Sequence, residues 1–443
     1  MRLPDPLQHR LYHHEAAWPV IAGSRARCDD SVQNIAVGPL SNITVLDLSR
    51  ILAGPWATQC LADFGATVWK IEKPGTGDDT RHWGPPWLKD SAGRDSNEAA
   101  YYLSCNRGKH SLAIDFTKPA GQKLIRALAG RADVLIENFR VGTLARYGLG
   151  YEDLRGANPR LIYCSISAFG QDGPAAGGAG YDAMIQAMSG LMSVTGIPDG
   201  EPGAGPVKVG VAVSDLISGM YALSAVLGAL YERERSGEGQ AIDLALLDSQ
   251  VAALANQSLN YLISGTAPGR RGTAHQNIVP YQAFTTADGY LMLAVGNDRQ
   301  FASFCAAAGS PELAADERYR SNAGRVANRA TLVPEIDRLC GQKSTRQWLA
   351  TLAPLGVPCG SINNLAQVFD EPQLKHRKMR FELPHPIAGR LPQVRNPVLY
   401  SRSQLEYRDP PPLLGQHTQL VLQQELGLSL SEFETLRSSG VVA

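Results

Sequence analysis

Short apolar segments alternate with helix-forming segments through residues 43–167, and this alternation constrains the fold more than any other feature of the chain. Pro55 stands at the favoured first position of a helix that runs through Phe64, and another helix is expected over residues 119–129. Strands that alternate with helices predict an α/β fold with a parallel sheet and right-handed crossovers. Buried strands are expected over residues 43–48, 66–72, 111–116, 132–138 and 161–167.

The turn between the first strand and the first helix limits which cofactors the fold can bind. It runs from Arg50 to Gly54 as RILAG and lacks the GxGxxG pattern that holds a pyrophosphate at a helix start. The strand–turn–helix–strand unit is therefore Rossmann-like, but its turn argues against NAD or FAD. A polar loop over residues 73–89 follows the next strand, and loops of this length in compact domains are usually functional.

Length, charge and cysteine use limit the class of protein. A chain of 443 residues is too long for one ordinary core, so two or more domains are expected. Basic and acidic residues balance at 42 each, so neither nucleic acid nor an anionic membrane is an expected partner. The chain has no run of about 18 apolar residues, so no membrane span is expected. Seven widely spaced cysteines without a CxxC pair favour the reducing cytoplasm, or the mitochondrial matrix in a eukaryote.

Other regions depart from the alternating pattern. Residues 1–38 carry prolines and histidines but no apolar core of a secretory signal, so we expect a loosely packed extension there. A long apolar segment over residues 242–263 is predicted to be helical. Residues 272–340 combine a strand behind an Asp-Gly turn with polar helices, which predicts a second, smaller domain.

The stretch over residues 208–231 is the strongest candidate for chemistry. Residues 209–213 are predicted to be a short buried strand, and an apolar helix face follows at Leu216, Met220, Leu223 and Leu227. Asp215 stands at the junction. Two interpretations are open, because Ser and Asp are favoured helix N-caps while a carboxylate among apolar residues also suits catalysis. From pattern alone the cap is favoured by about two to one.

Several stretches together resemble the class III CoA-transferase family, which includes formyl-, carnitine- and succinyl-CoA transferases and the 2-methylacyl-CoA racemases. Residues 272–284 and the loop 78–86 look most like its succinyl-CoA:glutarate branch. The matching stretches are VLDLSRILAGPWATQCLADFGATVWKIEKPGTGDDTR (45–81), ADVLIENFRVGTLARYGLGYEDL (132–154), GYDAMIQAMSGLMSVTG (180–196), GVAVSDLISGMYA (210–222), GVPCGSINN (356–364) and PLLGQHT (412–418).

The resemblance implies a fold that composition does not show. Each subunit would be an open ring formed by a large Rossmann-like domain and a small α+β domain, and two rings would interlock as a homodimer. The large domain would combine 39–235 with 373–443, the small domain would be 272–340, and linkers would cover 236–271 and 341–372.

The resemblance also assigns Asp215 as the nucleophile. Its carboxylate would attack the donor thioester to give a mixed anhydride, and CoA thiolate would then convert this into an aspartyl-CoA thioester. The acceptor acid, a small dicarboxylate such as glutarate, would reverse the exchange. Coenzyme A would enter as the acyl-CoA substrate, and no metal or prosthetic group is expected. We expect the helix start at 215–217 to offer N–H groups to developing negative charge.

The remaining site residues follow from the same resemblance. Candidates for binding CoA are Ile51, Leu52, Ala53, Lys73, Ile114, Asn138, Phe139 and Arg146. Candidates for the distal carboxylate of a dicarboxylate substrate are Arg107, Arg81, Arg271 and His275. Asp182 is a candidate second carboxylate near the nucleophile. Simpler roles stay open: loop anchors for Arg81 and Arg107, a solvated surface side chain for Arg146, and a helix cap for Asp182.

This chain departs from the family pattern at several positions, and two other functions compete with CoA transfer. Some members carry glutamine at the position of Leu52, lysine at Thr117 and a glycine-rich lid at 272–275. The racemase branch carries a His-Asp pair where this chain has Tyr181 and Asp182. Racemisation needs that histidine as one of two acid/base groups, so its absence argues against a racemase. The other rival is a CoA-binding homologue without catalysis.

Overall fold

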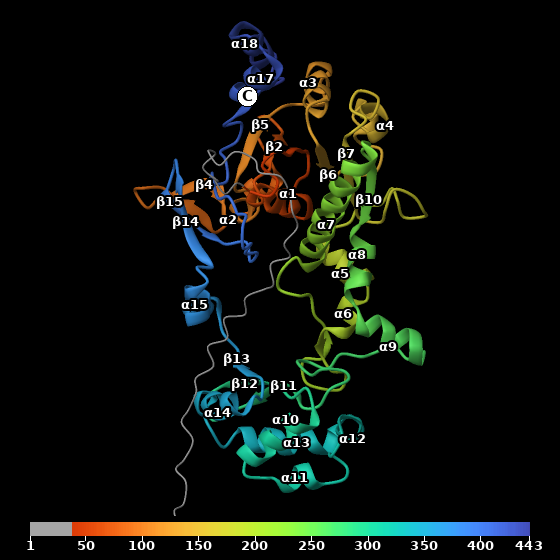
Figure 1. The fold of residues 1–443 in the computed structure, drawn as a ribbon, viewed down its shortest axis with the longest axis vertical. Helices are drawn as coiled ribbons and strands as arrows, with labels where there is room; N and C mark the ends of the chain where they lie inside the picture. The colour runs from red at the N-terminus through yellow and green to blue at the C-terminus, as the bar shows by residue number, and fades with distance from the viewer. Residues whose placement is uncertain (1–37) are drawn as a thin grey trace, which may run out of the picture. The chain divides into compact units, whose positions relative to one another are not determined.

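A computed structural model describes residues 38–443, so the extension predicted over residues 1–38 lies outside the described residues apart from Gly38. A six-stranded parallel sheet forms the centre (Figure 1), in the order β10-β7-β6-β1-β2-β5. The predicted α/β fold with a parallel sheet is confirmed. The strands are β1 (Thr44–Asp47), β2 (Thr67–Glu72), β5 (Lys109–Ala113), β6 (Val134–Glu137), β7 (Ile162–Ser167) and β10 (Ala241–Ala245).

The strand order reverses at one place in this sheet. The chain builds outward from β1 through β2 to β5, then returns to β6 on the other side of β1 and continues outward through β7. This is the order of a doubly wound dinucleotide-type fold, in which ligands bind at the carboxyl ends of the strands beside the reversal. The fold therefore marks the ends of β1 and β6 as a binding position.

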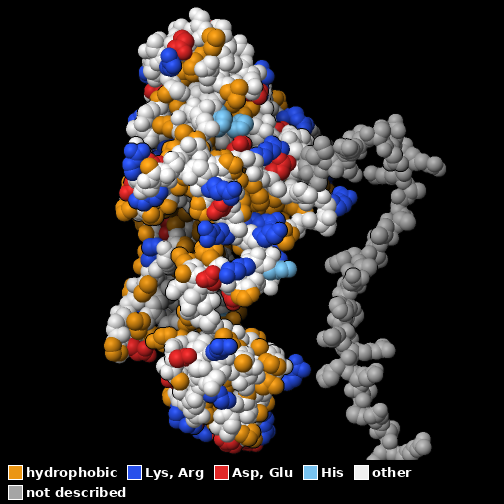
Figure 2. All heavy atoms as spheres, turned by 90° about the vertical axis from the view of Figure 1, so that its left-hand side faces the viewer, with side chains coloured by type: hydrophobic (Ala, Val, Ile, Leu, Met, Phe, Trp, Pro, Cys, Tyr) orange, Lys and Arg blue, Asp and Glu red, His pale blue; other side chains and the backbone are white. Residues whose placement is uncertain are grey.

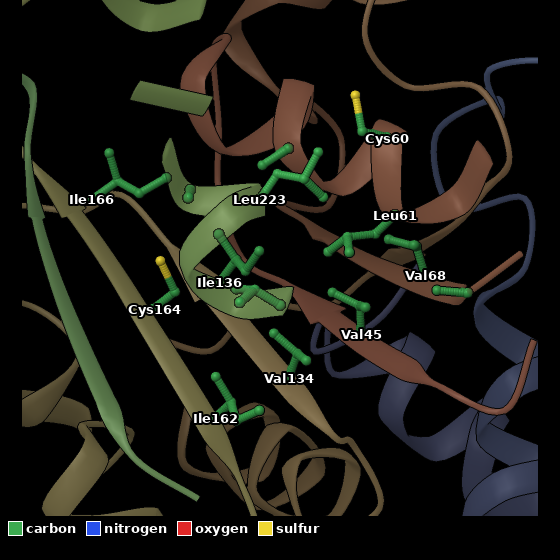
Figure 3. Close-up of a cluster of buried hydrophobic side chains, with 14 of the residues drawn as sticks. Val45, Cys60, Leu61, Val68, Val134, Ile136, Ile162, Cys164, Ile166 and Leu223 are labelled. Carbon is green, nitrogen blue, oxygen red and sulfur yellow. The ribbon is translucent and has the colours of Figure 1, made fainter. Parts of the chain in front are cut away.

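The sheet is apolar on both faces because helices cover both. Val45 and Val134 point into one core with residues of α1 (Ala53–Asp63) and α7 (Val213–Ser236), as Figure 3 shows. Leu46 and Leu135, their neighbours in sequence, point into the opposite core. Residues that alternate between two cores read as continuous apolar runs, which is why these strands were predictable.

The opposite core joins segments from both ends of the described chain. It contains α3 (Pro119–Ala129) together with α17 (Thr418–Leu426) and α18 (Leu430–Ser438). Ile114 also pairs as a bridge with Val442. The last residues of the chain are thus part of the wall of the central sheet.

A third core surrounds an antiparallel sheet of β11 (Tyr281–Thr285), β12 (Tyr290–Ala294) and β13 (Cys359–Ser361). Its helices are α10 (Asp298–Ala307), α13 (Arg329–Cys340) and α14 (Thr345–Leu352). Trp348 and Val357 are buried in this core, although the sequence placed them in the linker 341–372. The boundaries of the domains stay a prediction.

The prediction for the start of α7 is wrong. Residues 209–212 lie outside any strand, and the helix begins at Val213 with Ala212 as its N-cap. The predicted apolar face is buried only in part, since Leu223 lies in the core while Met220 is 46% exposed, and small residues such as Gly219 and Ala222 share the buried face. A Cβ on Gly219 would lie 2.6 Å from the carbonyl oxygen of Ala53, so only glycine permits this approach of α7 to α1.

α7 meets the length and composition of a membrane-crossing helix, and half of its most apolar window is buried inside the protein. Its buried residues pack against α1, β7 and β10. Figure 2 shows Lys and Arg side chains interspersed with Asp and Glu side chains over one face of the protein, as the balanced composition predicts.

The predicted long helix over 242–263 is wrong at its start. Ile242 lies in β10, which pairs with β7 at the edge of the sheet, and two helices follow, α8 (Leu246–Ala253) and α9 (Asn256–Ser264). A short apolar run fits strand and helix equally well, and pairing with β7 decides between them.

The other elements connect these cores. They are η1 (Asp79–His82), β3 (Trp87–Lys89), β4 (Asp95–Ala99), α2 (Ala100–Leu103), η2 (Ala145–Tyr147), α4 (Tyr151–Leu154), α5 (Asp182–Met188), α6 (Leu191–Val194), β8 (Gly196–Ile197), β9 (Gly205–Pro206), α11 (Glu312–Ala315), α12 (Asn322–Ala327), η3 (Ala353–Leu355), α15 (Leu365–Asp370), α16 (Pro372–His376), β14 (Arg380–His385) and β15 (Gly389–Val394).

Two histidines join β5 to the C-terminal segment. The rings of His110 and His417 stack at 4.6 Å, and Nδ1 of His417 accepts the backbone N–H of Ser111 at 3.3 Å. Burial lowers the pKa of His110. Burial, and next the charge of His110, lower the pKa of His417 to about 4. The fold therefore holds both rings neutral.

The stacked pair predicts a loss of stability in mild acid. An unfolded histidine binds a proton near pH 6.5, whereas His417 in the fold binds one only near pH 4, so the free energy of unfolding falls as the pH falls between these values. Urea unfolding between pH 7.5 and 4.5 measures it. His417→Asn should flatten the decline, while the exposed His376→Asn should keep it. A variant at 417 with the wild-type slope would refute this origin.

Candidate active site

A cavity of about 180 Å³ lies at the reversal of the strand order. It is bordered by the residues after β1, β6 and β7 and by the start of α1, and its wall includes Asp215 near the start of α7. The predicted site residues that line it are Ile51, Leu52, Ala53, Asn138, Phe139 and Asp215. Segments far apart in the sequence thus bring the predicted nucleophile and most of the predicted CoA contacts to one cavity.

Asp215 is buried on the wall of this cavity. It is the third residue of α7 and is 8% exposed. Burial, and secondly the charge of Asp182, raise the pKa of Asp215 to about 7. Among residues 38–443, no side chain or backbone N–H donates a hydrogen bond to its carboxyl group. A buried carboxyl group without a partner is costly unless a ligand uses it.

Asp182 supplies the cap of α7. Its Oδ1 accepts the backbone N–H groups of Ser214 at 2.8 Å and of Asp215 at 3.4 Å, and its Oδ2 accepts Nε2 of Gln186 at 2.6 Å. The contacts show the helix-cap role of Asp182 and place its carboxylate beside Asp215, while its part in the chemistry stays a prediction. The N-cap interpretation of Asp215 itself is wrong.

The same contacts correct the expected source of charge stabilisation. The N–H groups of Ser214 and Asp215 are bonded to Asp182, and that of Leu216 donates to the carbonyl of Ala212. They are not free to bind a developing oxyanion. The N-terminus of α1, at Leu52 and Ala53, borders the cavity and has no side-chain cap and no acidic residue in its first turn.

The sequence analysis missed two buried glutamines beside the site. Oε1 of Gln186 accepts the N–H of Val209 at 3.0 Å, and Oε1 of Gln250 accepts the hydroxyl of Ser214 at 2.8 Å. Both side chains are buried. They fix the segment that leads into α7. A glutamine inside an apolar helix was the only sequence signal for either.

Three predicted CoA contacts do not line the Asp215 cavity. Lys73 is exposed after β2, and Arg146 is exposed in η2. Ile114 is buried and pairs with Val442 in the opposite core. Their roles toward CoA stay predictions.

The predicted cations for the distal carboxylate lie outside the cavity as well. The Arg81 guanidinium pairs with Glu72 at 2.8 Å and Glu98 at 3.1 Å, and Arg107 pairs with Asp63 at 2.6 Å. Both arginines are buried, so these pairs favour the loop-anchor alternative.

Arg271 and His275 precede β11. Nε of Arg271 donates to the side chain of Gln276 at 2.5 Å, and the ring of His275 lies 5.2 Å from that of Tyr281. Neither residue lines the Asp215 cavity.

Two other arginines do line it. Arg50 pairs with Asp79 at 2.7 Å and lies over the ring of Phe139. Arg140 is exposed and makes no ion pair with residues 38–443. Both adjoin predicted contacts in the sequence, which was the signal for them. Within the same range no three His, Cys, Asp or Glu side chains are grouped as metal ligands.

Comparison with known proteins agrees with this arrangement. The family model described as CoA-transferase family III matches residues 40–418. The chain is 50% identical to a succinate–glutarate CoA-transferase of Agrobacterium fabrum, over 87% of this chain and 95% of the relative. It is 44% identical to a human succinyl-CoA:glutarate CoA-transferase, over 92% of this chain and 90% of the relative.

A solved structure shows the same fold. A CaiB/BaiF family protein from Brucella suis superimposes with a TM-score of 0.76 at 46% identity, covering 88% of this chain and all of that one. With the family model, the identities and the cavity at the expected end of the sheet in agreement, the chain belongs to CoA-transferase family III.

Proposed function

We propose that this enzyme moves CoA from succinyl-CoA to glutarate or a closely similar dicarboxylic acid. The relatives that share 44 to 50% of its residues carry that activity in their names. The observation that carries the proposal is the buried carboxyl group of Asp215, which has no partner among the described residues and lines the cavity at the reversal of the sheet.

The covalent steps use Asp215 alone as the attacking group of the protein. A carboxylate oxygen attacks the succinyl thioester carbon, the carbon–sulfur bond breaks, and CoA thiolate leaves an aspartyl–succinyl anhydride. The thiolate attacks the aspartyl carbonyl, releasing succinate and forming an aspartyl-CoA thioester. Glutarate then attacks the carbonyl of this thioester, which releases CoA thiolate and forms an aspartyl–glutaryl anhydride. The thiolate attacks the glutaryl carbonyl of this anhydride, which gives glutaryl-CoA and restores the Asp215 carboxylate. Each exchange conserves an activated acyl bond.

The surroundings of Asp215 suit these steps. Burial limits access of water, which would hydrolyse the anhydride. The uncapped N-terminus of α1 lies on the same cavity and favours negative charge nearby, in the role first expected of α7. Burial is the larger cause of the raised pKa of Asp215, and the charge of Asp182 is the second. A carboxylate with a raised pKa is a more basic nucleophile when it is ionised.

We further propose that the subunit is an open ring, that two rings interlock as a cytoplasmic homodimer, and that the domain boundaries are those expected from the sequence. Large apolar side chains are exposed on α7 and α9, and such surface usually marks an interface. They are Met220, Tyr221, Tyr231, Leu259, Tyr261, Leu262 and Ile263. A second, mostly apolar cavity of about 1260 Å³ between α1, α7 and β15 offers further surface for a partner.

Removing the nucleophile tests the proposal. Asp215→Ala should abolish transfer from succinyl-CoA to glutarate and the covalent protein–CoA adduct seen by mass spectrometry, while CoA binding by calorimetry stays within about threefold, since only the attacking atom is lost. Asp248→Ala is the matched control, because Asp248 is an exposed first-turn carboxylate of α8 outside the cavity. Substantial turnover by the Asp215 variant would contradict the mechanism.

The raised pKa predicts the pH dependence of the first step. Only ionised Asp215 attacks, so the rate of adduct formation in a single turnover should rise with pH and reach half of its maximum near pH 7. Asp182→Asn removes the second cause of the shift, so the midpoint should move to lower pH. An unchanged or higher midpoint in that variant would show that Asp182 does not act on Asp215 through its charge.

The placement of the arginines predicts which one reads the acid. Arg140→Gln should lower kcat/KM for glutarate roughly tenfold to a hundredfold relative to a monocarboxylic acid of the same length, as loss of a charge-assisted hydrogen bond would. Arg107→Gln should instead lower stability by about 3–5 kcal/mol and affect all acids alike, because it leaves the buried Asp63 carboxylate without its ion-pair partner. Arg131→Gln is the exposed control, because Arg131 follows α3 and does not line the cavity. Selective loss of glutarate in the Arg107 variant would reverse this assignment.

A further inference from the structure

We infer that Asn138 and Asp78 are positioning residues that hold the turn Ser49–Leu52, here called the Ile51 turn, in a strained conformation that sets the start of α1 against Asp215. The inference rests on the proposed function and deepens it. The sequence assigned Asn138 to CoA, whereas the structure shows its Oδ1 and its Nδ2 each hydrogen-bonded to the turn.

The Ile51 turn contains a strained residue. Ile51 has a φ of +71°, in the left-handed region that β-branched residues rarely adopt. It lies between the end of β1 and Leu52, the N-cap of α1, and it lines the cavity. A residue in such a conformation persists only when its neighbours determine it. The relaxed alternative would change the course of the chain just before α1 begins.

Asn138, just past the end of β6, holds the backbone of Arg50 on both sides of its Cα. Its Nδ2 donates to the carbonyl oxygen of Arg50 at 2.7 Å, and its Oδ1 accepts the N–H of Arg50 at 2.8 Å. Both polar groups of the side chain therefore bind the residue just before Ile51. Phe139, the residue after Asn138, is fixed as well, since Oε2 of the buried Glu137 accepts its backbone N–H at 2.8 Å.

Asp78 holds the other side of the Arg50–Ile51 peptide. Its Oδ1 accepts the N–H of Ile51 at 3.3 Å, and its Oδ2 accepts Nζ of Lys70 at 2.9 Å. Lys70 also donates to the carbonyl of Ser49 at 2.9 Å, so one buried ion pair binds the turn on both sides of Arg50. Asp78 and Lys70 are buried, which makes this support costly to rearrange.

These contacts fix the wall that faces the nucleophile. Leu52 and Ala53 follow Ile51 directly and line the cavity with Asp215. A turn that relaxed at Ile51 would displace the uncapped end of α1 from the reacting carbonyl. Loss of Asn138 should therefore lower the rate of the covalent steps rather than the affinity for CoA.

Relief of the strain provides the test. Glycine adopts a positive φ without cost, so a chain with Gly at position 51 keeps the turn with less help from Asn138. Asn138→Ala should lower kcat about 30-fold with a CoA affinity within about threefold of wild type. Ile51→Gly alone gives the loss that comes from removing the isoleucine side chain at the cavity, and the kcat of the double variant should exceed the value expected from the product of the two single losses by at least about tenfold.

Several results would overturn the inference. Asn138→Ala could weaken CoA binding with kcat unchanged, which assigns the side chain to the ligand. The double variant could show the product of the two single losses, which excludes strain as the link. Asn158→Ala is the matched control, since Nδ2 of Asn158 donates to the carbonyls of Ala129 and Ala132 away from the site, and it should keep the wild-type kcat.

A further arm separates this inference from the proposed function. Wild-type protein without transfer between succinyl-CoA and glutarate would contradict the function alone. Hydrogen exchange of residues 49–58 still tests the turn, with faster exchange expected in Asn138→Ala than in wild type or Asn158→Ala. Equal exchange in all three, or an Asn138→Asp variant as active as wild type despite losing the donor to Arg50, would contradict the clamp.

Discussion

Two buried ion pairs stabilise the part of the central sheet that borders the Asp215 cavity. Lys70 in β2 pairs with Asp78 at 2.9 Å, Lys109 in β5 pairs with Asp47 at 3.1 Å, and all four side chains are inaccessible to solvent. Burial alone would lower the pKa of Lys70, but Asp78 and Asp47 raise it above its ordinary value, so the lysine stays charged. Such charges persist only where every partner is in place. The end of β1 is thus tied to the start of β5 through Asp47 and Lys109, and β2 is tied through Lys70 and Asp78 to the loop that follows it.

The cavity owes its character to two carboxylates in unlike surroundings. Asp182 is bonded to two backbone N–H groups and to Gln186, whereas Asp215 has no donor among the described residues. Environments that differ in this way give neighbouring carboxyl groups different tasks. One carboxylate holds the start of α7, and the other has no hydrogen-bond donor of its own within residues 38–443. The helix that carries the proposed nucleophile is therefore capped by a residue from another helix rather than by its own sequence.

The sequence predicted most of the central sheet because strands buried on both faces form unbroken apolar runs. It also predicted the convergence of Asp215 with Ile51 and Asn138, through motifs that resemble a known family. It missed what depends on distant pairing. Asp182 accepts the N–H of Asp215 from 33 positions earlier in the chain. The segment of β10 is a strand because it pairs with β7. Arg107 forms an ion pair with Asp63 and does not line the Asp215 cavity. None of these partners leaves a periodic or local mark in the chain.

The place of the last residues has a consequence for how the protein is made. Phe433, Val441 and Val442 are buried in the core that covers one face of the sheet, beside α3 from the first third of the chain. During synthesis the strands emerge long before the segment that covers them, and non-local contacts of this kind fold slowly. The sheet stays half-covered until residues 418–442 have been synthesised. We expect the nascent chain to depend on chaperones over that interval, and a variant that lacks these residues to expose the same apolar face permanently.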